Sequence, residues 1–456
     1  MPQGLAPPDV DLHIYLHAEL LPNIRQITLY ISLPQHLTFD GVRAEIRLLE
    51  SRQAVTASLP EPLSHVTKTI QLPAHVSDPT RRKFNVDAAS AVKSGPRNPS
   101  GSQCDYSFRL QIDPKDSAPK SGEELIDDYV PWTAEDMSSS TRIRCHACGN
   151  LFLKDPCIQH KAGGDDQGRS GWVWKDLPSG NWAEMMDFWH CHKPDPHQHD
   201  SKAEATVALQ LEDRNAGTKG YGAASHVEAT PGTVLIDVAT FLLAESDCVG
   251  LEKDNTEETK PSSEEPTQRT LHCEKCSATI GVEDPSVGGW RVLKANVSLN
   301  TMHREADDDQ WQSHSAEVIV AAQLLEMIER ESARRFVVHC GQKSGLLLWV
   351  FNPDICYSNS SSGHRVNAQQ AMKVFFQETD DVDAIINRDL GKPSLLSVEE
   401  LELPGMIFQA LSDALLASNQ MLPLSARRFN EWQVGLLSRF SRRETAGSLA
   451  TPCIDV

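Results

Sequence analysis

The sequence predicts an α+β protein made of three consecutive domains, and three observations predict it. Apolar and polar residues alternate at the period of a half-buried strand through the first hundred residues. Two Cys-x-x-Cys pairs lie in the middle of the chain, and the last third mixes strand patterns with amphipathic helical ones. We therefore expect an N-terminal antiparallel β-rich domain at 1–135, a central domain at 136–285 and a C-terminal mixed α/β domain at 286–456.

The N-terminal domain is predicted from five alternating segments, several of them separated by Pro-containing breaks such as Leu33-Pro34 and Leu59-Pro60. Short strands with breaks of this kind are typical of an antiparallel sheet or sandwich, and a chance succession of polar and apolar residues is the alternative. Residues 76–103 are rich in Ser, Asp, Pro, Gly and Lys and are predicted to form a long loop. The predicted strands are 12–17, 27–33, 42–48, 67–72 and 106–112.

The C-terminal domain is predicted from two amphipathic helices and three strands. Apolar residues of the first helix recur on one stripe, and the second helix follows the break Pro404-Gly405. Two of the strands flank the segment 341–345 and are expected to form a hairpin. The stretch 429–437 fits a strand or a helix, and both stay open. The predicted helices are 316–330 and 406–422, and the predicted strands are 290–297, 335–340 and 346–351.

The charge of the chain limits the classes of partner. The sequence has 43 Lys and Arg against 63 Asp and Glu, which gives a net charge of −20. A surface this acidic repels phosphate backbones, so we expect no direct binding to nucleic acid. Stretches such as 193–220 and the acidic linker 252–268 are too polar to offset the entropy lost on ordering.

Cysteine usage and the lack of targeting signals indicate the compartment. No run approaches the roughly 20 apolar residues that a membrane helix needs, so no membrane association is expected. The N-terminus shows no basic segment followed by an apolar one, so no secretory signal is visible. Eleven cysteines in such a chain are best interpreted as thiols or metal ligands in a reducing compartment. We therefore expect a cytoplasmic or nuclear protein.

Two matched Cys-x-x-Cys turns, each between short strand patterns, predict a metal site. The first knuckle is Cys145 to Cys148 and the second is Cys273 to Cys276. Each turn brings two sulfur atoms toward one point, and four thiolates complete the tetrahedral shell that zinc prefers. The knuckles are 125 residues apart, so a shared structural Zn²⁺ would close a large insertion. Two unrelated turns or a redox dithiol are the alternatives.

The insertion between the knuckles contains a helical pattern rich in Trp and Met. Asn181 and Glu184 form a capping-box-like start, and Lys193-Pro194 is a natural stop. One face of this helix is expected either to pack into the core or to bind a partner. A metal ligand or a reactive thiol could lie in His190-Cys191-His192, where imidazoles flank the thiol. The residues on the face are Trp182, Met185, Met186 and Trp189.

Several of these segments carry a family resemblance. The sequence resembles the HECT-like ubiquitin-ligase family that binds ubiquitin-conjugating enzymes, from the N-terminal strands to Phe429-Asn430-Glu431-Trp432. The resemblance implies a ligase that docks a ubiquitin-loaded conjugating enzyme and promotes ubiquitin transfer to a lysine of a substrate protein. The segments that carry it are Cys145–Gly149, Leu177–His192, the second knuckle and Leu348–Asp354.

The resemblance also raises the question of a catalytic cysteine. In a HECT-type mechanism a thiolate attacks the incoming thioester and holds ubiquitin covalently. No local sequence marks that nucleophile here. By neighbourhood, Cys191 is the first candidate, Cys340 beside His339 at the predicted hairpin tip is the second, and Cys356 is the third. Each could instead be a small buried hydrophobe.

Two further function classes stay open at this stage. A zinc-stapled adaptor or chaperone-like protein would bind a conjugating enzyme or a client without covalent chemistry. A zinc-dependent redox protein would use its dithiols directly, and loss of the fold on chelation would exclude it.

Overall fold

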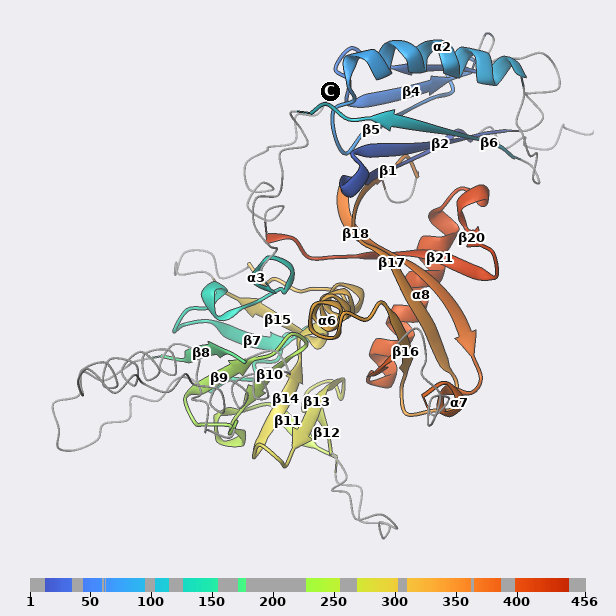
Figure 1. Cartoon of the computed structure of the whole chain (residues 1–456). Helices are drawn as coiled ribbons and strands as arrows, with labels where there is room; N and C mark the ends of the chain where they lie inside the picture. The colour runs from blue at the N-terminus through green and yellow to red at the C-terminus, as the bar shows by residue number, and fades with distance from the viewer. Residues whose placement is uncertain are drawn as a thin grey trace, which may run out of the picture. The chain divides into compact units, whose positions relative to one another are not determined.

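The computed structural model describes residues 13–34, 44–59, 61, 63–94, 103–114, 126–154, 171–177, 227–254, 269–301, 310–361, 365–386 and 398–442. The chain forms two compact units, and each unit combines two separated segments (Figure 1). Unit 1 contains Met1–Glu124 and Ala333–Arg439, and unit 2 contains Leu125–Ser332 and Phe440–Val456.

This division differs from the three consecutive domains expected at 1–135, 136–285 and 286–456. The C-terminal segment of unit 1 completes the sheet that the N-terminal strands begin, because Leu20 pairs with Cys356 and His17 with Asn359. Alternation in a sequence predicts a strand but not its neighbour, so pairing over such a distance cannot be read from the pattern. The predicted α+β class agrees with the structure, which is mostly β with a few helices.

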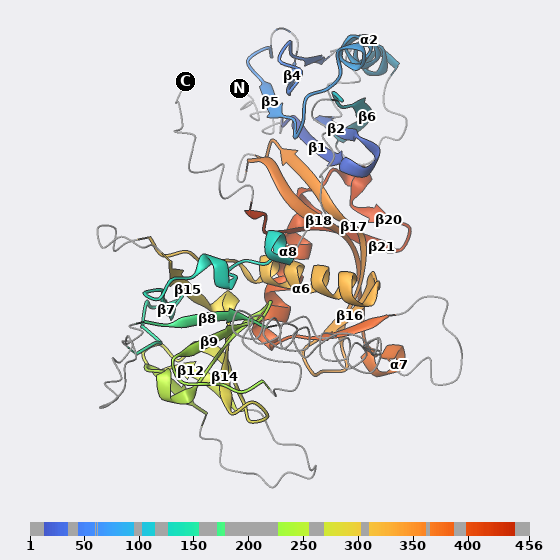
Figure 2. The ribbon, with the colours of Figure 1, turned by 60° about the vertical axis from the view of Figure 1, so that its left-hand side comes forward.

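Unit 1 is built around a nine-stranded sheet with the order β20-β21-β18-β17-β1-β2-β6, onto which β16 and β19 are added beside β17. The pairs are antiparallel except for β16 with β19. The long strands β17 and β18 run from the C-terminal part of the unit to the N-terminal strands (Figure 2). The strands are β1 (Tyr15–Leu21), β2 (Gln26–Pro34), β6 (Gln103–Gln111), β16 (Arg335–His339), β17 (Gly345–Asn359), β18 (Val366–Thr379), β19 (Glu399–Glu402), β20 (Arg428–Phe429) and β21 (Trp432–Ser438).

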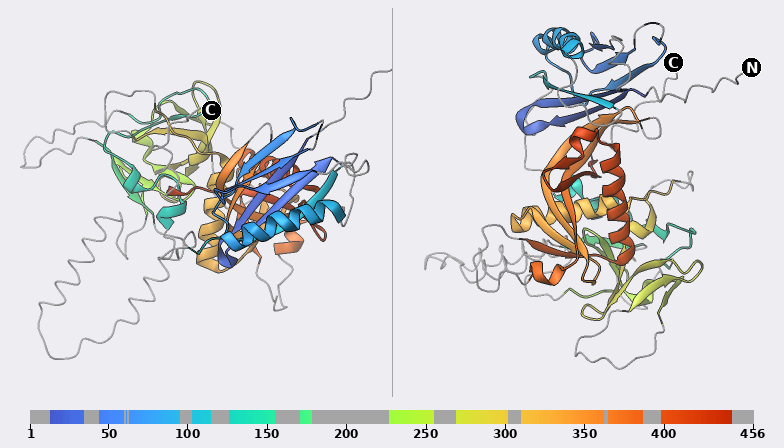
Figure 3. Two further views of the ribbon diagram at one scale, coloured as in Figure 1. Left: turned by 90° about the horizontal axis from the view of Figure 1, so that it is seen from above. Right: turned by 90° about the vertical axis from the view of Figure 1, so that its right-hand side faces the viewer.

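A three-stranded sheet and one helix cover the N-terminal end of unit 1. The strands are β3 (Glu45–Leu48), β4 (Ala54–Ser58) and β5 (Thr67–Gln71), and the helix is α2 (Asp78–Ser94). The long loop predicted at 76–103 is therefore wrong over most of its length. Helix α2 lies alongside the N-terminal strands of unit 1 (Figure 3). It is mainly polar and buries Phe84 and Ala88 against the core, so its apolar stripe is too thin to stand out in the sequence.

The C-terminal elements of unit 1 agree with most of the predictions. The hairpin is confirmed, because His339 of β16 pairs with Gly345 of β17. Helix α8 (Gly405–Met421) matches the predicted helix, and the open stretch 429–437 forms the end of β20 and most of β21. Helix α8 packs on β21, where a Cβ atom on Gly435 would lie 2.8 Å from Leu415. The short elements are η1 (Pro22–Ile24), α7 (Val382–Ile386) and η6 (Leu424–Ala426).

Unit 2 contains a seven-stranded sheet with the order β11-β12-β13-β14-β10-β9-β8 and a separate pair, β15 with β7. The strand predicted at 290–297 is two strands joined by the 3-10 turn η4 (Lys294–Asn296), and α6 (Ala316–Glu331) confirms the helix predicted at 316–330. The strands are β7 (Arg142–Cys145), β8 (Val173–Asp176), β9 (Thr233–Ile236), β10 (Thr240–Leu243), β11 (Leu251–Lys253), β12 (Thr270–Cys273), β13 (Thr279–Asp284), β14 (Gly289–Leu293) and β15 (Val297–Asn300). Short helices are α3 (Ile126–Tyr129), η2 (Ala134–Asp136) and η3 (Glu245–Asp247).

Buried aromatic and aliphatic side chains form one core between the two sheets of unit 2. Phe152 and Phe241 are fully buried there, together with Trp132 and the first cysteine of each knuckle. The segment after Phe440 is tied to this unit by an ion pair between Arg442 and Asp136. Within the part of the chain that the structure describes, no helix has the length and apolar character to cross a bilayer.

Candidate metal centre

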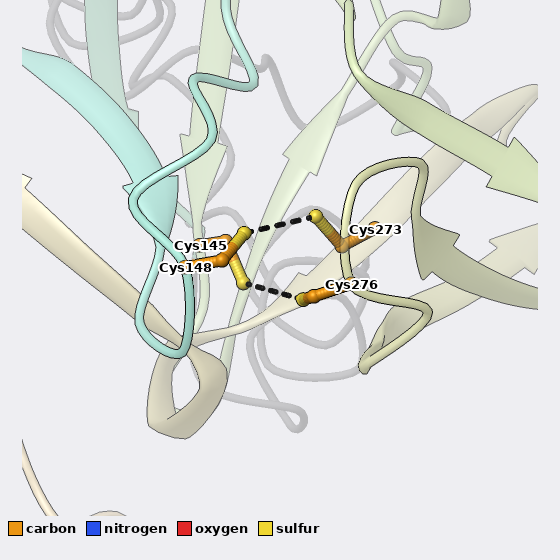
Figure 4. Close-up of side chains that lie close together, drawn as sticks. All are labelled: Cys145, Cys148, Cys273 and Cys276. Carbon is orange, nitrogen blue, oxygen red and sulfur yellow. Dashed lines mark hydrogen bonds between the residues drawn. The ribbon is translucent and has the colours of Figure 1, made fainter.

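Four cysteine side chains from two loops point toward one another in unit 2 (Figure 4). The Sγ atoms of Cys145 and Cys276 are 3.7 Å apart, and those of Cys148 and Cys273 are 3.6 Å apart. All four sulfur atoms lie within 4.8 Å of one another. A disulfide would need about 2.05 Å, whereas sulfur atoms at about 2.3 Å from a tetrahedral ion are separated by about 3.8 Å. The geometry therefore fits a four-coordinate metal ion.

The two knuckles have the same backbone. In each knuckle, the backbone amide of the first cysteine donates to the carbonyl of the fifth residue after it. The amide of the fourth residue after it donates to the carbonyl of that same cysteine. That fourth residue has a positive φ, 75° at Gly149 and 56° at Ser277. The hydrogen bonds are Cys145 N to Asn150 O (2.7 Å), Gly149 N to Cys145 O (2.9 Å), Cys273 N to Ala278 O (2.9 Å) and Ser277 N to Cys273 O (2.8 Å). Because the two turns have the same backbone, each knuckle presents its two sulfur atoms to the site in the same arrangement.

The surroundings of the two buried thiols shift their pKa values in opposite directions. Burial alone would raise the pKa of Cys273, but hydrogen bonds from the backbone amides of Cys276 and Lys275 lower it to about 7. Burial raises the pKa of Cys145 to about 12, which matches its nearly complete exclusion from solvent. Since Cys145 and Cys273 are buried and all four ligand positions are protein sulfur atoms, a metal ion here would have no open position.

The site links parts of unit 2 that lie on different sheets. The first knuckle follows β7 of the two-stranded sheet, and the second follows β12 of the seven-stranded sheet. The carbonyl of Gly250 reinforces the link, because it accepts hydrogen bonds from Asn150 Nδ2 (3.1 Å) and Glu274 N (3.0 Å). The predicted joining of two distant knuckles is therefore what the structure shows.

The structure gives Cys340 and Cys356 different surroundings from those of an activated thiol. The ring of His339, the expected neighbour of Cys340, has both nitrogen atoms engaged: Nδ1 accepts from Gly341 N (3.0 Å) and Nε2 lies 2.8 Å from Glu400 Oε1. No lone pair of this imidazole is free to take the proton of Cys340. Cys356 is 6% exposed within β17, as a buried hydrophobe would be.

The other candidate residues lie outside the described part of the chain. They belong to the segment that the sequence predicts as a Trp- and Met-rich helix and to the histidines and cysteine after it, namely Trp182, Met185, Met186, Trp189, His190, Cys191 and His192. Most of the acidic linker 252–268 also lies outside it.

A buried lysine of unit 2 was not found by sequence reasoning. Lys294, in η4, is fully buried, and its Nζ donates to the carbonyls of Pro131 (2.8 Å) and Trp132 (3.2 Å). Burial lowers the pKa of Lys294 to about 7. The nearby ring of His314 packs edge-on against Trp132, and burial together with the charge of Lys294 lowers the pKa of His314 to about 4. A single Lys within a strand-like pattern gives no signal of such burial.

Comparisons with known proteins bear on what the whole chain does. Residues 19–434 match the model of a family described as HECT-like ubiquitin-conjugating enzyme (E2)-binding. An uncharacterized protein of Saccharomyces cerevisiae is 28% identical over 310 residues, which cover 67% of this chain and 72% of that protein. An uncharacterized protein of Schizosaccharomyces pombe is 24% identical over 323 residues, with coverage of 69% and 79%.

A further relative has a name that refers to ubiquitin transfer. A protein of Homo sapiens named as an E3 ubiquitin-protein ligase is 24% identical over 323 residues, which cover 64% of this chain and 71% of that protein. No solved structure matches the chain. Because the family model spans most of the sequence, including both knuckles, the chain belongs to the HECT-like family that binds ubiquitin-conjugating enzymes.

Proposed function

We propose that this protein is a ubiquitin-protein ligase that docks a ubiquitin-loaded conjugating enzyme and promotes transfer of ubiquitin to a lysine of a substrate protein. The observation that carries the proposal is the match of residues 19–434 to an E2-binding family, to which relatives named E3 ubiquitin-protein ligase add support. Its partners are then the conjugating enzyme, ubiquitin and the substrate, and it binds them in the cytoplasm or the nucleus.

The ion at the four-cysteine site is proposed to be a structural Zn²⁺. Soft thiolate ligands in a tetrahedral arrangement select zinc over magnesium or calcium. A four-thiolate shell leaves zinc no position for substrate, so its part is to join the two knuckles and not to act as a Lewis acid. The sulfur separations of 3.6 and 3.7 Å support this assignment.

The covalent form of the reaction needs a thiol outside the zinc site. In that form Cys191 would attack the thioester carbonyl, the conjugating enzyme would leave as its thiolate, and a lysine amine would then displace the Cys191 thiolate to form an isopeptide bond. Cys340 is the second candidate, although both ring nitrogen atoms of the neighbouring His339 are engaged in other contacts.

A second function, a non-covalent adaptor or ligase that only positions the conjugating enzyme, is favoured by one observation. Among the cysteines whose side chains the structure describes, the exposed one is Cys276, a ligand of the metal site, while Cys248 and Cys356 are buried. Cys340 is partly exposed, but both ring nitrogen atoms of its neighbour His339 are engaged, whereas a nucleophile requires an accessible thiolate.

The test is a single-turnover reaction of the full chain with a ubiquitin-charged conjugating enzyme and free lysine. The ligase should accelerate discharge of ubiquitin from the conjugating enzyme. If Cys191 is the nucleophile, a reductant-sensitive adduct forms, Cys191→Ala abolishes it, and Cys340→Ala does not. Acceleration that survives Cys191→Ala without any adduct identifies the non-covalent form. Absence of both binding and acceleration would contradict the proposed function.

A further inference from the structure

Five aromatic side chains of unit 1 form one contiguous group, here called the aromatic platform: Trp349, Phe351, Phe375, Phe429 and Trp432. They come from β17, β18, β20 and β21, which are neighbours in the nine-stranded sheet. The ring of Phe375 stacks with that of Phe351 (centroids 4.8 Å apart) and with that of Phe429 (5.0 Å). Trp349 lies edge-on to Phe375 at 5.3 Å and to Trp432 at 6.2 Å. The rings thus form one surface.

Much of this surface faces solvent. Phe375 is 3% exposed at the centre, whereas Phe351 is 48% exposed and Phe429 is 46% exposed. Helix α8 does not cover this face, because it packs against Gly435 and Phe376, and side chains at successive positions of a strand point to opposite faces. Exposed aromatic side chains gathered in one patch are typical of a binding surface.

The platform joins one segment that carries the family resemblance to the segment at which that resemblance ends. The segment Leu348–Asp354 supplies Trp349 and Phe351, and the segment 429–432 supplies Phe429 and Trp432. Both segments lie within residues 19–434, the part that matches the E2-binding family. The proposed zinc site gives the two knuckles a role, but it gives none to the segments Leu348–Asp354 and 429–432.

One charge at the platform indicates the chemistry of the partner. The guanidinium of Arg335, on β16, lies over the ring of Trp349 at 5.0 Å from its centroid. Arg335 has no ion pair with a carboxylate within the described residues, although the chain carries an excess of acidic groups. Arginine and aromatic residues at the centre of an exposed patch are the composition of interface hot spots. A matching surface would therefore offer an apolar side chain beside a carboxylate.

We propose that the aromatic platform is the surface on which the conjugating enzyme docks. An apolar side chain of that enzyme packs on the rings of Phe351 and Phe429, and a neighbouring carboxylate pairs with Arg335. The inference rests on the proposed function for the identity of the partner, and it assigns docking to unit 1, not to the Trp- and Met-rich segment 181–193.

The test measures binding of purified conjugating enzymes to the immobilised full chain. Phe351→Ser and Phe429→Ser are each expected to weaken binding about tenfold or more, as substitutions at hot spots do. Arg335→Glu should weaken binding and reverse the contribution of this residue to the salt dependence, because two like charges then face each other and salt screens their repulsion. The matched control is Val86→Ser on α2, a residue of unit 1 that is 68% exposed and outside the platform, and it should bind as the unmodified chain does.

Two further measurements separate loss of binding from loss of fold. Thermal unfolding and zinc content should be unchanged in the three platform variants, since their side chains are at least partly exposed. A photo-crosslinking phenylalanine derivative placed at position 351 should crosslink to the conjugating enzyme in the otherwise unmodified chain, and the same group at position 86 should not.

The outcomes distinguish this inference from the proposed function. Full-strength binding by Phe351→Ser and Phe429→Ser, with no crosslink from position 351, would overturn the platform while leaving E2 docking intact. Absence of binding by the unmodified chain would overturn both. If the unmodified chain self-associates and Phe351→Ser makes it monomeric without affecting E2 binding, a second copy occupies the platform and the inference is wrong.

Discussion

Each of the two units encloses a lysine, and the two lysines are treated in opposite ways. Lys373, in β18 of unit 1, lies with its Nζ 2.7 Å from Glu19 Oε2, and its pKa is raised because the attraction of Glu19 outweighs the cost of burial. Lys294, in unit 2, contacts two backbone carbonyls, and its pKa is lowered to about 7 because burial outweighs the attraction of more distant carboxylates. Lys373 is therefore held as the cation of an ion pair, whereas Lys294 loses its proton more easily than an exposed lysine does.

The comparison teaches how each unit joins distant parts of the chain. In unit 1 the Glu19–Lys373 pair connects the first strand to a strand 354 positions later, and His17 Nε2 completes the cluster at 3.1 Å from Glu19. In unit 2 the corresponding place is the four-cysteine site, where the proposed ion would join the two knuckles, and Lys294 contacts only neutral acceptors, the carbonyls of Pro131 and Trp132. Chelation should therefore affect the units differently.

The largest effect is expected from loss of the metal. Cys273→Ser, or a strong chelator, leaves the two knuckles unjoined, and structural zinc sites contribute on the order of 10 kcal/mol to folding. Peptides from β12 and β13 should lose protection in hydrogen exchange, while peptides from β17 and β18 of unit 1 stay protected. Mass spectrometry of the native chain should find one zinc that Cys273→Ser removes. A zinc retained in full by Cys273→Ser, or equal loss of protection in both units, would contradict this assignment.

The second effect is expected at the buried ion pair of unit 1. Lys373→Met leaves the carboxylate of Glu19, which is 2% exposed, without its cation, and breaking a buried pair in this way costs about 3–5 kcal/mol. The double variant Glu19→Gln with Lys373→Met should recover much of that loss, since neither side then carries an uncompensated charge. Urea unfolding of the single and double variants measures the difference. If Lys373→Met is as stable as the unmodified chain, the ion pair between Glu19 and Lys373 does not stabilise the contact between β1 and β18.

The sequence could predict the metal site but not the two buried lysines. The positions of the cysteines depend on local turns, whereas the burial of a lysine depends on segments that are far apart in the sequence. A Cys-x-x-Cys turn positions its sulfur atoms through local backbone geometry, so the spacing predicts Cys145 with Cys148 and Cys273 with Cys276 as ligand pairs, and the likeness of the two turns suggests that they share one ion. The burial of Lys373 depends on β1 pairing with β17, which no local pattern specifies. Likewise, the rings of Phe351 and Phe429 both stack on Phe375 only because β17, β18, β21 and β20 are neighbours in the sheet.

A smaller effect is expected from Lys294. Lys294→Met removes the donor to two buried carbonyls, and unsatisfied groups of this kind cost about 1–3 kcal/mol in stability. The loss should be smaller than for Lys373→Met, because no charge is left unpaired. Hydrogen exchange of β14 and β15, the strands that flank η4, reports it. If Lys294→Met destabilises the protein more than Lys373→Met does, the contrast between the two lysines is wrong.

The smallest effect, and the one that isolates protonation, is the dependence of stability on pH between 7 and 9. The pKa of Lys294 is about 7 in the folded state and 10.5 in the reference state, so above pH 7 the unfolded chain binds more protons and the stability of unit 2 rises with pH. The slope is at most about 1.4 kcal/mol per pH unit. Lys373 has its pKa raised above 10.5, so it stays protonated in both states and adds no slope in this range. Subtracting the pH profile of Lys294→Met from that of the unmodified chain, in hydrogen exchange corrected for the intrinsic effect of pH, removes contributions from the thiols. A difference that is flat in unit 2 would mean that Lys294 keeps its proton in the folded state, as Lys373 does.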